Sequence, residues 1–557
     1  MRFRLLVFLA SALILGPVQA QQPPVSAKNA MVVTSEPLAT DVGVRILKQG
    51  GNAFDAAVAV GFTLAVTYPQ AGNLGGGGFL VGLTQHGTPM ALDFRETAPK
   101  AATRDMFLDE SGNLIPDKSL TSYKAVGVPG TVDGLLQLQA KFGRLTLEQD
   151  IAPAIRLAKF GFPVSAALHR VLESERARLG KIGPTAAIFY PDGEPIAEGA
   201  TLIQSDLGAA LQRILADGRK GFYEGDTAAM LAAVMEREGG LITQQDLKDY
   251  HAKWRSAFTV REGEFELITM PLPSSGGVTL AQILGLSDLG VLKRAGHNTA
   301  DYVQQLAEAE RLAYADRNQY LGDSDFANVP ISELTSRTYL STRKKLLPVG
   351  HAGSNKDEGS GVLEHRQTTH FCVVDKDGNV AAISYTLNGT FGMGAVLPGA
   401  GFLLNNEMDD FTAKVGAPNT YGLKQGEANA IQPKKRMLSS MTPTVIMRNG
   451  RFFGTIGSPG GSTIITTVLQ VFLNMALFDM NIREAIDAPR FHEQGWPDEI
   501  RYEQESFSPE AADSLRKMGY TLTPDPGLGQ VNGIVRLPDG GLQGWSDSRG
   551  SGKAAGF

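Results

Sequence analysis

The sequence of 557 residues predicts a globular protein that contains both helices and strands, and three observations lead to that class. Hydrophobic residues make up 43% and charged residues 20% of the chain, which excludes a disordered chain, a fibre and a coiled coil. Amphipathic patterns of helical period occur before residue 350, and strand patterns dominate after residue 367. No internal repeat and no long Pro- or Ser-rich linker is visible, so the three or four domains suggested by length alone lose support.

The helical patterns lie mainly in the first 320 residues. Residues 52–67 (NAFDAAVAVGFTLAVT) have a continuous apolar face and predict a buried helix. The glycine run at 75–78 leads into a predicted strand at 79–83. Residues 349–367 are rich in glycine, polar and charged residues and predict an exposed, flexible segment. Further amphipathic helices are expected at 132–142, 205–216, 226–238 and 301–317.

Charge and cysteine content exclude several classes of function. The net charge of −6 and the pI near 5.9 argue against a nucleic-acid-binding protein, which would usually carry a basic patch. The single cysteine, Cys372, cannot form an intramolecular disulfide or a cysteine-based zinc site. Neither a P-loop nor an H-E-x-x-H motif is present, so we expect no metal and no cofactor.

The N-terminus has the features of a secretory signal peptide. Arg2 and Arg4 precede an apolar run over residues 5–15, and Ala20 supplies a small residue at the expected cleavage position. We therefore expect residues 1–20 to be removed and the protein to be periplasmic or secreted, in a bacterium. The alternative is a membrane anchor, but the run is short for a hydrocarbon layer of about 30 Å. No membrane anchor is expected after signal cleavage.

The segment after the flexible stretch has a hairpin pattern. Residues 368–374 and 380–386 are strand-like, and 375–379 (DKDGN) is a turn signal. If the turn centres between residues 377 and 378, Thr368 lies opposite residue 387, one step from Thr386. Cleavage of the bond between Gln367 and Thr368 would give Thr368 a free α-amine, which could act as the base for its own hydroxyl. The alternative is an ordinary β-branched start to a strand.

Several further motifs, in shared order and spacing, resemble one family. They are GGNAFDAAVA at 50–59, DFRETAP at 93–99, PSSGG at 273–277, TTHFCVVDKDGN at 368–379, NNEMDDF at 405–411, LSSM at 438–441 and GSPGGS at 457–462. With these motifs the chain, from about Val32 to its end, resembles the γ-glutamyltranspeptidase family of N-terminal nucleophile hydrolases. The resemblance implies an α+β fold, a four-layer αββα sandwich of two stacked antiparallel sheets. It also implies autocatalytic cleavage into two intertwined subunits, residues 21–367 and 368–557, that form one folding unit.

The resemblance also implies the catalytic residues. Thr368 matches the nucleophile, whose α-amine serves as base, and Thr386 matches the threonine that hydrogen-bonds to it. Autocleavage would fall between Gln367 and Thr368. Gly460 and Gly461 match the oxyanion hole, because exposed N–H groups ahead of a helix suit a developing negative charge. On the residues alone, GSPGGS could equally be a glycine turn with a serine cap.

A γ-glutamyl group carries an α-carboxylate and an α-ammonium, and the family motifs supply partners for both. Arg95, Ser439 and Ser440 match the residues that bind the carboxylate. Asn388, Glu407 and Asp410 match the cluster that holds the amine, with Asp410 preferred to Asp409. Residues 414–423 resemble a lid loop in which Tyr421 covers the bound group. Without the resemblance, the acidic pair could be a solvated loop, and residues 414–423 could be an ordinary surface loop.

The resemblance implies a γ-glutamyltransferase and glutathione hydrolase. Such an enzyme would cleave the γ-glutamyl amide of glutathione and related compounds through an acyl-enzyme on Thr368. The acyl group would pass to water or to an amino acid or dipeptide acceptor. One alternative is a cephalosporin (glutaryl) acylase on the same scaffold. The other is an exported γ-glutamyl-binding protein that is never processed.

Overall fold

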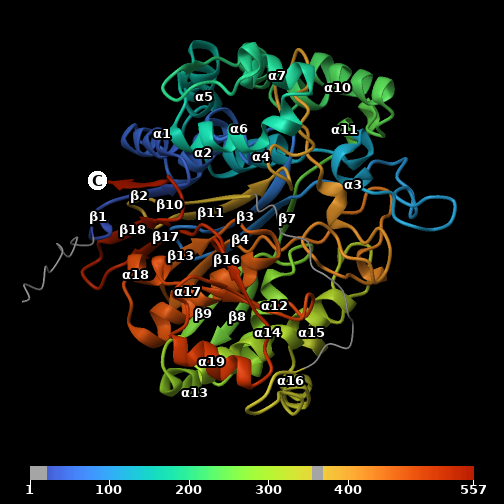
Figure 1. Cartoon of the computed structure of the whole chain (residues 1–557). Helices are drawn as coiled ribbons and strands as arrows, with labels where there is room; N and C mark the ends of the chain where they lie inside the picture. The colour runs from blue at the N-terminus through green and yellow to red at the C-terminus, as the bar shows by residue number, and fades with distance from the viewer. Residues whose placement is uncertain (1–21, 354–367) are drawn as a thin grey trace, which may run out of the picture.

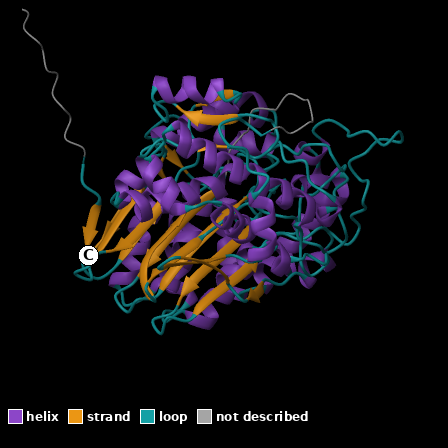
Figure 2. Ribbon diagram, turned by 90° about the horizontal axis from the view of Figure 1, so that it is seen from below, coloured by secondary structure: helices purple, strands orange, loops and turns teal. Residues whose placement is uncertain are grey.

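The computed structural model describes residues 22–353 and 368–557. The predicted signal peptide (1–20) and Gln367 lie outside the described residues. The described chain forms two seven-stranded antiparallel sheets that stack face to face, with helices on both outer sides (Figure 1). Figure 2 shows the long strands running side by side between helices. This is the αββα sandwich expected from the resemblance.

Each sheet combines strands from both ends of the chain, as the order of the strands across it shows. The first sheet holds β19 (Lys553–Gly556), β2 (Met31–Thr34), β10 (Thr369–Val374), β11 (Val380–Thr386), β3 (Gly77–Leu83), β4 (Pro89–Phe94) and β7 (Lys253–Arg255). The second sheet holds β1 (Val25–Ala27), β18 (Leu542–Ser546), β17 (Asn532–Arg536), β13 (Arg451–Gly457), β12 (Thr444–Arg448), β9 (Phe265–Thr269) and β8 (Phe258–Glu262). Two small ladders join β5 (Phe162–Pro163) to β6 (Thr201–Leu202), and β14 (Phe491–His492), β15 (Ile500–Glu503) and β16 (Leu522–Asp525) to one another.

The helices divide between the two outer faces (Figure 1). On the side of the first sheet lie α1 (Pro37–Lys48), α2 (Ala53–Thr67), α4 (Thr131–Phe142), α5 (Leu147–Phe160), α6 (Ala166–Leu179), α7 (Gly183–Phe189), α8 (Ser205–Asp217), α9 (Lys220–Tyr223), α10 (Gly225–Glu238) and α11 (Gln244–Asp249). On the side of the second sheet lie α12 (Gly276–Leu286), α13 (Leu289–Ala295), α14 (Ala300–Tyr320), α15 (Ile331–Leu334), α16 (Arg337–Lys344), α17 (Ile464–Phe478), α18 (Ile482–Asp487) and α19 (Pro509–Lys517). The short turns of helix are α3 (Lys118–Thr121), η1 (Tyr123–Ala125), η2 (Pro191–Gly193), η3 (Glu407–Asp410), η4 (Glu427–Asn429) and η5 (Gly461–Thr463).

The five helices predicted from the sequence form as α2, α4, α8, α10 and α14. The start of α2 is fixed by a capping box, in which Asn52 accepts from the N–H of Asp55 and the Asp55 carboxylate accepts from the N–H of Asn52. Every residue of α2 is buried, because the helix packs between the first sheet and α1, α4 and α5. The segment Gly461–Phe478 is apolar and long enough to cross a membrane, but 89% of it is buried inside the fold.

The hairpin of β10 and β11 lies at the centre of the first sheet. Alternate residues of β10 face opposite sides: Phe371 and Val373 join the core beneath α2, and Cys372 and Val374 join the core between the sheets. The turn has five residues, and Asp375 ties it together by accepting from the N–H groups of residues 377 and 379. The hairpin therefore centres on residue 377, and Thr368 falls opposite Thr386, one residue from the predicted partner 387.

Candidate active site

Thr368 lies immediately before β10, in the middle of the first sheet, and is 5% exposed. Its Oγ1 donates to Oγ1 of Thr386 at 3.4 Å. The Thr386 hydroxyl oxygen also accepts from the backbone N–H of Asn388 at 2.9 Å, which holds Thr386 in place. A hydroxyl partner for Thr368 is thus supplied by the neighbouring strand, as the hairpin pattern predicted.

The glycine loop follows β13, the strand of the second sheet that stacks on β11. Gly460 and Gly461 have φ values of 136° and 55°, a region of backbone conformation that favours glycine. Within residues 22–353 and 368–557, neither of their N–H groups donates a hydrogen bond. Two unpaired N–H groups beside a nucleophile are what an oxyanion hole requires. The predicted strand, turn and helix all form here, as β13, η5 and α17.

Arg95 lies just beyond the end of β4 and is fully buried. Its guanidinium forms ion pairs with Glu407 and Asp410, both from η3. Burial raises the pKa of both carboxyls, and the positive charge of Arg95 works against that rise. The residues predicted for the two ends of a γ-glutamyl group therefore contact one another directly.

Asp410 and its neighbour Asp409 point in different directions. The carboxylate of Asp409 accepts from Ser119 Oγ at 2.6 Å and from the N–H of Thr420 at 3.1 Å. It therefore ties η3 to α3 and to the predicted lid loop. Asp410 instead lines the cavity beside Thr368, and its preference over Asp409 as the amine contact stays a prediction.

The predicted lid residue, Tyr421, closes one side of this cavity. Its side chain is 5% exposed, and its hydroxyl donates to the carbonyl of Asn388 at 2.9 Å. Asn388 has a left-handed backbone (φ 73°), and its side-chain amide donates to the carbonyl of Asn406 at 3.0 Å. Tyr421 and Asn388 thus form a common wall over the acidic end of the cavity.

One small cavity brings together nearly all the predicted site residues. Its lining includes Arg95, Thr368, Thr386, Asn388, Glu407, Asp410, Tyr421, Ser439, Ser440 and Gly461. The exception, Gly460, lines a second cavity that also borders Thr368. Their roles stay predictions, but their convergence from segments up to 366 residues apart is a property of the fold.

Two residues of the site were missed by the sequence analysis. Arg317, from α14, lines the small cavity and is 1% exposed. Glu96 lies behind Arg95, and burial together with the charge of Glu407 raises its pKa. Both of its carboxylate oxygens lack a hydrogen-bond partner among the described residues. Glu96 has a partial signal in the sequence, because it adjoins Arg95 in DFRETAP, and Arg317 has none.

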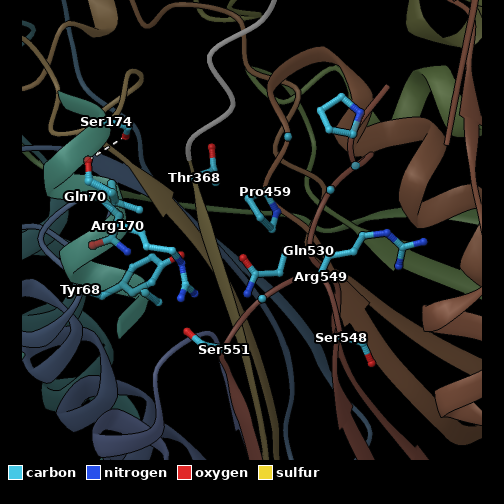
Figure 3. A pocket seen from close by; sticks show the side chains of 17 residues that line it. Tyr68, Gln70, Arg170, Ser174, Thr368, Pro459, Gln530, Ser548, Arg549 and Ser551 are labelled. Atoms are coloured by element: carbon cyan, nitrogen blue, oxygen red, sulfur yellow. Dashed lines mark hydrogen bonds between the residues drawn. The ribbon is translucent and has the colours of Figure 1, made fainter. Parts of the chain in front are cut away.

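The second cavity opens on the other side of Thr368 and measures about 660 Å³. Figure 3 shows Thr368 at its head, with Tyr68, Gln70 and Arg170 on one wall and Pro459, Gln530 and Arg549 on the other. Arg549 is engaged by Glu503 and Asp547, whereas Arg170, on α6, is exposed and has no hydrogen bond or ion pair to any described residue. The nucleophile therefore stands between a small charged cavity and a larger open one.

Known proteins of one family resemble this chain in sequence and in fold. The family model described as gamma-glutamyltranspeptidase matches residues 39–557. The glutathione hydrolase proenzyme of Escherichia coli (strain K12) is 47% identical over 530 residues, which cover 94% of this chain and 91% of that protein. The crystal structure of a cephalosporin acylase from Bacillus halodurans superimposes with a TM-score of 0.85 at 25% identity, covering 99% of both chains. The Helicobacter pylori gamma-glutamyltranspeptidase structure covers 56% of this chain and 90% of its own, with a TM-score of 0.55 and 42% identity. The chain therefore belongs to the γ-glutamyltranspeptidase family.

Proposed function

We propose that this protein is a glutathione hydrolase and γ-glutamyltransferase that matures by cutting its own chain before Thr368. The observation that carries the proposal is the position of Thr368. Its hydroxyl lies beside Thr386, between a small cavity of paired charges and the glycine loop, where the N–H groups of Gly460 and Gly461 donate to no described residue. Maturation gives two subunits, residues 21–367 and 368–557. They stay together because β10 and β11 sit at the centre of a sheet whose other strands come from both segments.

Maturation needs one intramolecular acyl shift. The Thr368 hydroxyl oxygen attacks the carbonyl carbon of Gln367, the C–N bond breaks, and the hydroxyl proton passes to the nitrogen, which becomes the new α-amine. Water then hydrolyses the ester, which leaves a carboxylate on Gln367 and restores the Thr368 hydroxyl. The new amine has an ordinary pKa of about 7.7–8.0, so a useful fraction is neutral and can act as a base.

The same hydroxyl then carries out the transfer reaction. The α-amine accepts the hydroxyl proton as Oγ1 attacks the γ-carbonyl carbon, and the N–H groups of Gly460 and Gly461 stabilise the resulting oxyanion. Collapse of this intermediate breaks the amide bond, and the leaving amine takes the proton. Water or an acceptor amine attacks the γ-glutamyl ester and frees Thr368.

Substrate binding exchanges ion pairs within the small cavity. The α-ammonium of the γ-glutamyl group displaces Arg95 from part of its contact with Asp410 and Glu407. The released guanidinium then pairs with the α-carboxylate, together with the hydroxyls of Ser439 and Ser440. The number of buried pairs of opposite charge does not fall on binding. The cost of desolvating the α-ammonium and α-carboxylate of the γ-glutamyl group is therefore offset.

The larger cavity is the route for the leaving group and for acceptors. The acyl group fills the small cavity, so an amino acid or dipeptide acceptor reaches the ester from the side of Gly460 and Arg170. The N-terminal leader supports export to the periplasm or the medium, where the mature protein acts without a membrane anchor.

A glutaryl acylase is the main alternative, because a glutaryl group would also place a carboxylate in the small cavity, where the α-carboxylate of a γ-glutamyl group would bind. The acidic end of the cavity favours the γ-glutamyl substrate: Asp410 and Glu407 are suited to an ammonium group, which a glutaryl group lacks. Turnover of a γ-glutamyl anilide several orders of magnitude above that of the glutaryl amide is expected. The reverse order would make the protein an acylase.

A denaturing gel together with an anilide assay tests the proposal. The active enzyme should give bands of about 37 and 20 kDa, in proportion to its 347 and 190 residues. Thr368→Ala should remain one chain without activity. An unprocessed wild-type chain that binds γ-glutamyl compounds without turnover would instead identify a binding protein. Cleavage of the Thr368→Ala chain at the same bond would refute self-cleavage by this residue.

A further inference from the structure

Arg317 is a buried cation in the wall of the small cavity, and the function proposed above gives it no role. It comes from the last turn of α14, and its side chain is almost fully enclosed. No carboxylate lies within ion-pair distance of it among the described residues. A buried charge without an opposite charge is costly, so a site that retains one is suited to a ligand of opposite charge.

The contacts of Arg317 are all with neutral oxygen atoms. Its Nε donates to Ser275 Oγ and its Nη2 donates to Ser440 Oγ, both at 3.0 Å. Its Nη1 donates to the side-chain oxygens of Asn318 at 3.0 Å and Gln425 at 3.4 Å. These contacts fix the guanidinium in one orientation, and none of them is with a carboxylate.

The bond to Ser440 also fixes what that serine can offer a ligand. A hydroxyl has one proton to donate, and here its oxygen already accepts from Arg317. The Ser439 oxygen likewise accepts, from the N–H of Met441 at 3.1 Å. Neither hydroxyl proton is donated to a described residue. Both serines therefore hold their O–H groups available for an acceptor in the cavity, and a carboxylate is the acceptor that two hydroxyls and a cation fit best.

The charges of the cavity support the same ligand. Arg95 forms ion pairs with Glu407 and Asp410, whereas Arg317 forms an ion pair with none of the described residues and interacts with Asp410 only beyond ion-pair distance. A γ-glutamyl group brings one ammonium and one carboxylate. The ammonium has two acidic partners in the cavity, and the carboxylate has in Arg317 a cation that forms an ion pair with no described carboxylate.

We propose that Arg317 is a second cation for the α-carboxylate of the bound γ-glutamyl group, acting beside Arg95 and orienting the Ser440 hydroxyl toward that carboxylate. The inference rests on the proposed function, because it names the residue that completes recognition of the same donor. Arg317 is a specificity-determining and positioning residue, and it takes no part in the bond-breaking steps.

Three small inhibitors separate this role from a structural one. L-Glutamate carries both the α-carboxylate and the amine, 4-aminobutyrate lacks the α-carboxylate, and glutarate lacks the amine. Their inhibition constants are measured against hydrolysis of a γ-glutamyl anilide. In Arg317→Gln, we expect inhibition by glutamate and glutarate to weaken about tenfold and inhibition by 4-aminobutyrate to stay the same. Arg317→Lys, which keeps the charge, should recover part of the loss.

Two variants serve as controls. Asp410→Asn should show the complementary pattern, with glutamate and 4-aminobutyrate weakened and glutarate unchanged. Arg311→Gln, six residues earlier on α14, removes a cation that pairs with Glu308 outside the cavity and should change none of the three constants. If Arg317→Gln matures poorly, the ligand-induced shift in unfolding temperature replaces the kinetic measurement.

Equal weakening of all three inhibitors in Arg317→Gln would show a purely structural role, and no change in any of them would remove Arg317 from recognition. Either result overturns the inference. Failure of the proposed function looks different, because the wild-type protein would then hydrolyse no γ-glutamyl anilide, whatever stands at position 317.

Discussion

The imidazole ring of His370 occupies the space that a side chain on Gly457 would need. A Cβ built on Gly457 would lie 2.3 Å from the His370 ring, well inside contact distance. His370 is two residues after Thr368 on the face of β10 that meets the second sheet, and Gly457 ends β13 just before the glycine loop. Burial lowers the pKa of His370 to about 3, so the ring is neutral. This contact sets the spacing between the nucleophile strand and the oxyanion loop.

We expect Gly457→Ala to lower kcat about 100-fold, because a shift of about 1 Å between nucleophile and oxyanion donors is enough for such a loss. The donor KM should change little, since the carboxylate and amine contacts lie elsewhere. Steady-state kinetics on the γ-glutamyl anilide measures both. Gly183→Ala, at a surface glycine with open space around it, is the matched control.

The double variant Gly457→Ala with His370→Ala tests whether the ring itself is responsible. Removing the ring should relieve the clash, so the double variant should be more active than the two single losses combined predict. Strict additivity of the two losses would show that His370 and Gly457 act separately.

Replacing Arg95 should damage both binding and stability. Arg95→Ala leaves the buried carboxyls of Glu407 and Asp410 without their cation, and breaking such a pair typically costs about 3–5 kcal/mol. We expect a large rise in donor KM and a clear fall in the unfolding temperature. Adding Glu407→Gln should restore part of the stability without restoring donor affinity. An unchanged KM in Arg95→Ala would remove Arg95 from the donor site.

Local pattern was sufficient for much of the fold. The capping box before α2, the five-residue turn after β10 and the strand, glycine turn and helix from β13 to α17 each depend on residues close together in sequence. The hairpin register was wrong by one residue, because the position of the turn's centre depends on which N–H groups Asp375 binds. The sequence DKDGN alone does not show which N–H groups the Asp375 carboxylate will bind.

The site was predictable only where its residues sit in short motifs. Asp410 and Ser440 lie in NNEMDDF and LSSM, and both line the cavity. Arg317 is one of many charged residues in a long amphipathic helix, and nothing near it in sequence marks it as buried. Its importance appears only when α14 packs beneath the loop of Ser440, 123 residues away. Long-range packing of this kind has no signature in a single sequence.

Asp150 should make the stability of this protein depend on pH. It lies in the first turn of α5, fully buried, with no partner for either carboxylate oxygen among the described residues. Burial, with a smaller contribution from Asp55, raises the pKa of Asp150 from 3.8 to about 8. The folded protein therefore prefers the neutral acid, and the unfolded chain ionises at lower pH. This contribution to stability is complete below about pH 4 and is lost as pH rises toward 8.

Asp150→Asn removes that loss. The free energy of unfolding of the variant, relative to that of wild type, should increase by about 1–3 kcal/mol when the pH is raised from 5 to 8.5. This is the typical cost of burying a polar group without a partner. Urea unfolding at the two pH values measures the difference. Glu148→Gln, at an exposed position on the same turn, should show no such trend. Parallel pH dependence in wild type and Asp150→Asn would contradict the assignment.

Arg170 should select acceptors that carry a carboxylate. It is exposed on α6, in the wall of the larger cavity, and has no ion pair to any described residue. On the same wall, Gln70 is buried and its Oε1 accepts no hydrogen bond from the described chain. A free cation beside an unused carbonyl oxygen suits a dipeptide, whose carboxylate and peptide N–H match the two groups. We expect Arg170→Ala to raise the acceptor KM for glycylglycine about three- to tenfold, with hydrolysis of the anilide unchanged.

The comparison that isolates the carboxylate uses glycylglycine and glycylglycinamide as acceptors. The wild-type enzyme should prefer the acid, Arg170→Ala should lose most of that preference, and Arg170→Glu should reverse it, because the charge at the wall changes sign. Arg176→Ala, on the same helix and paired with Glu194 away from the cavity, is the control. Added salt should weaken the preference in wild type, since an exposed ion pair is screened. An acid preference that survives in Arg170→Glu would place the carboxylate contact on another residue of the cavity.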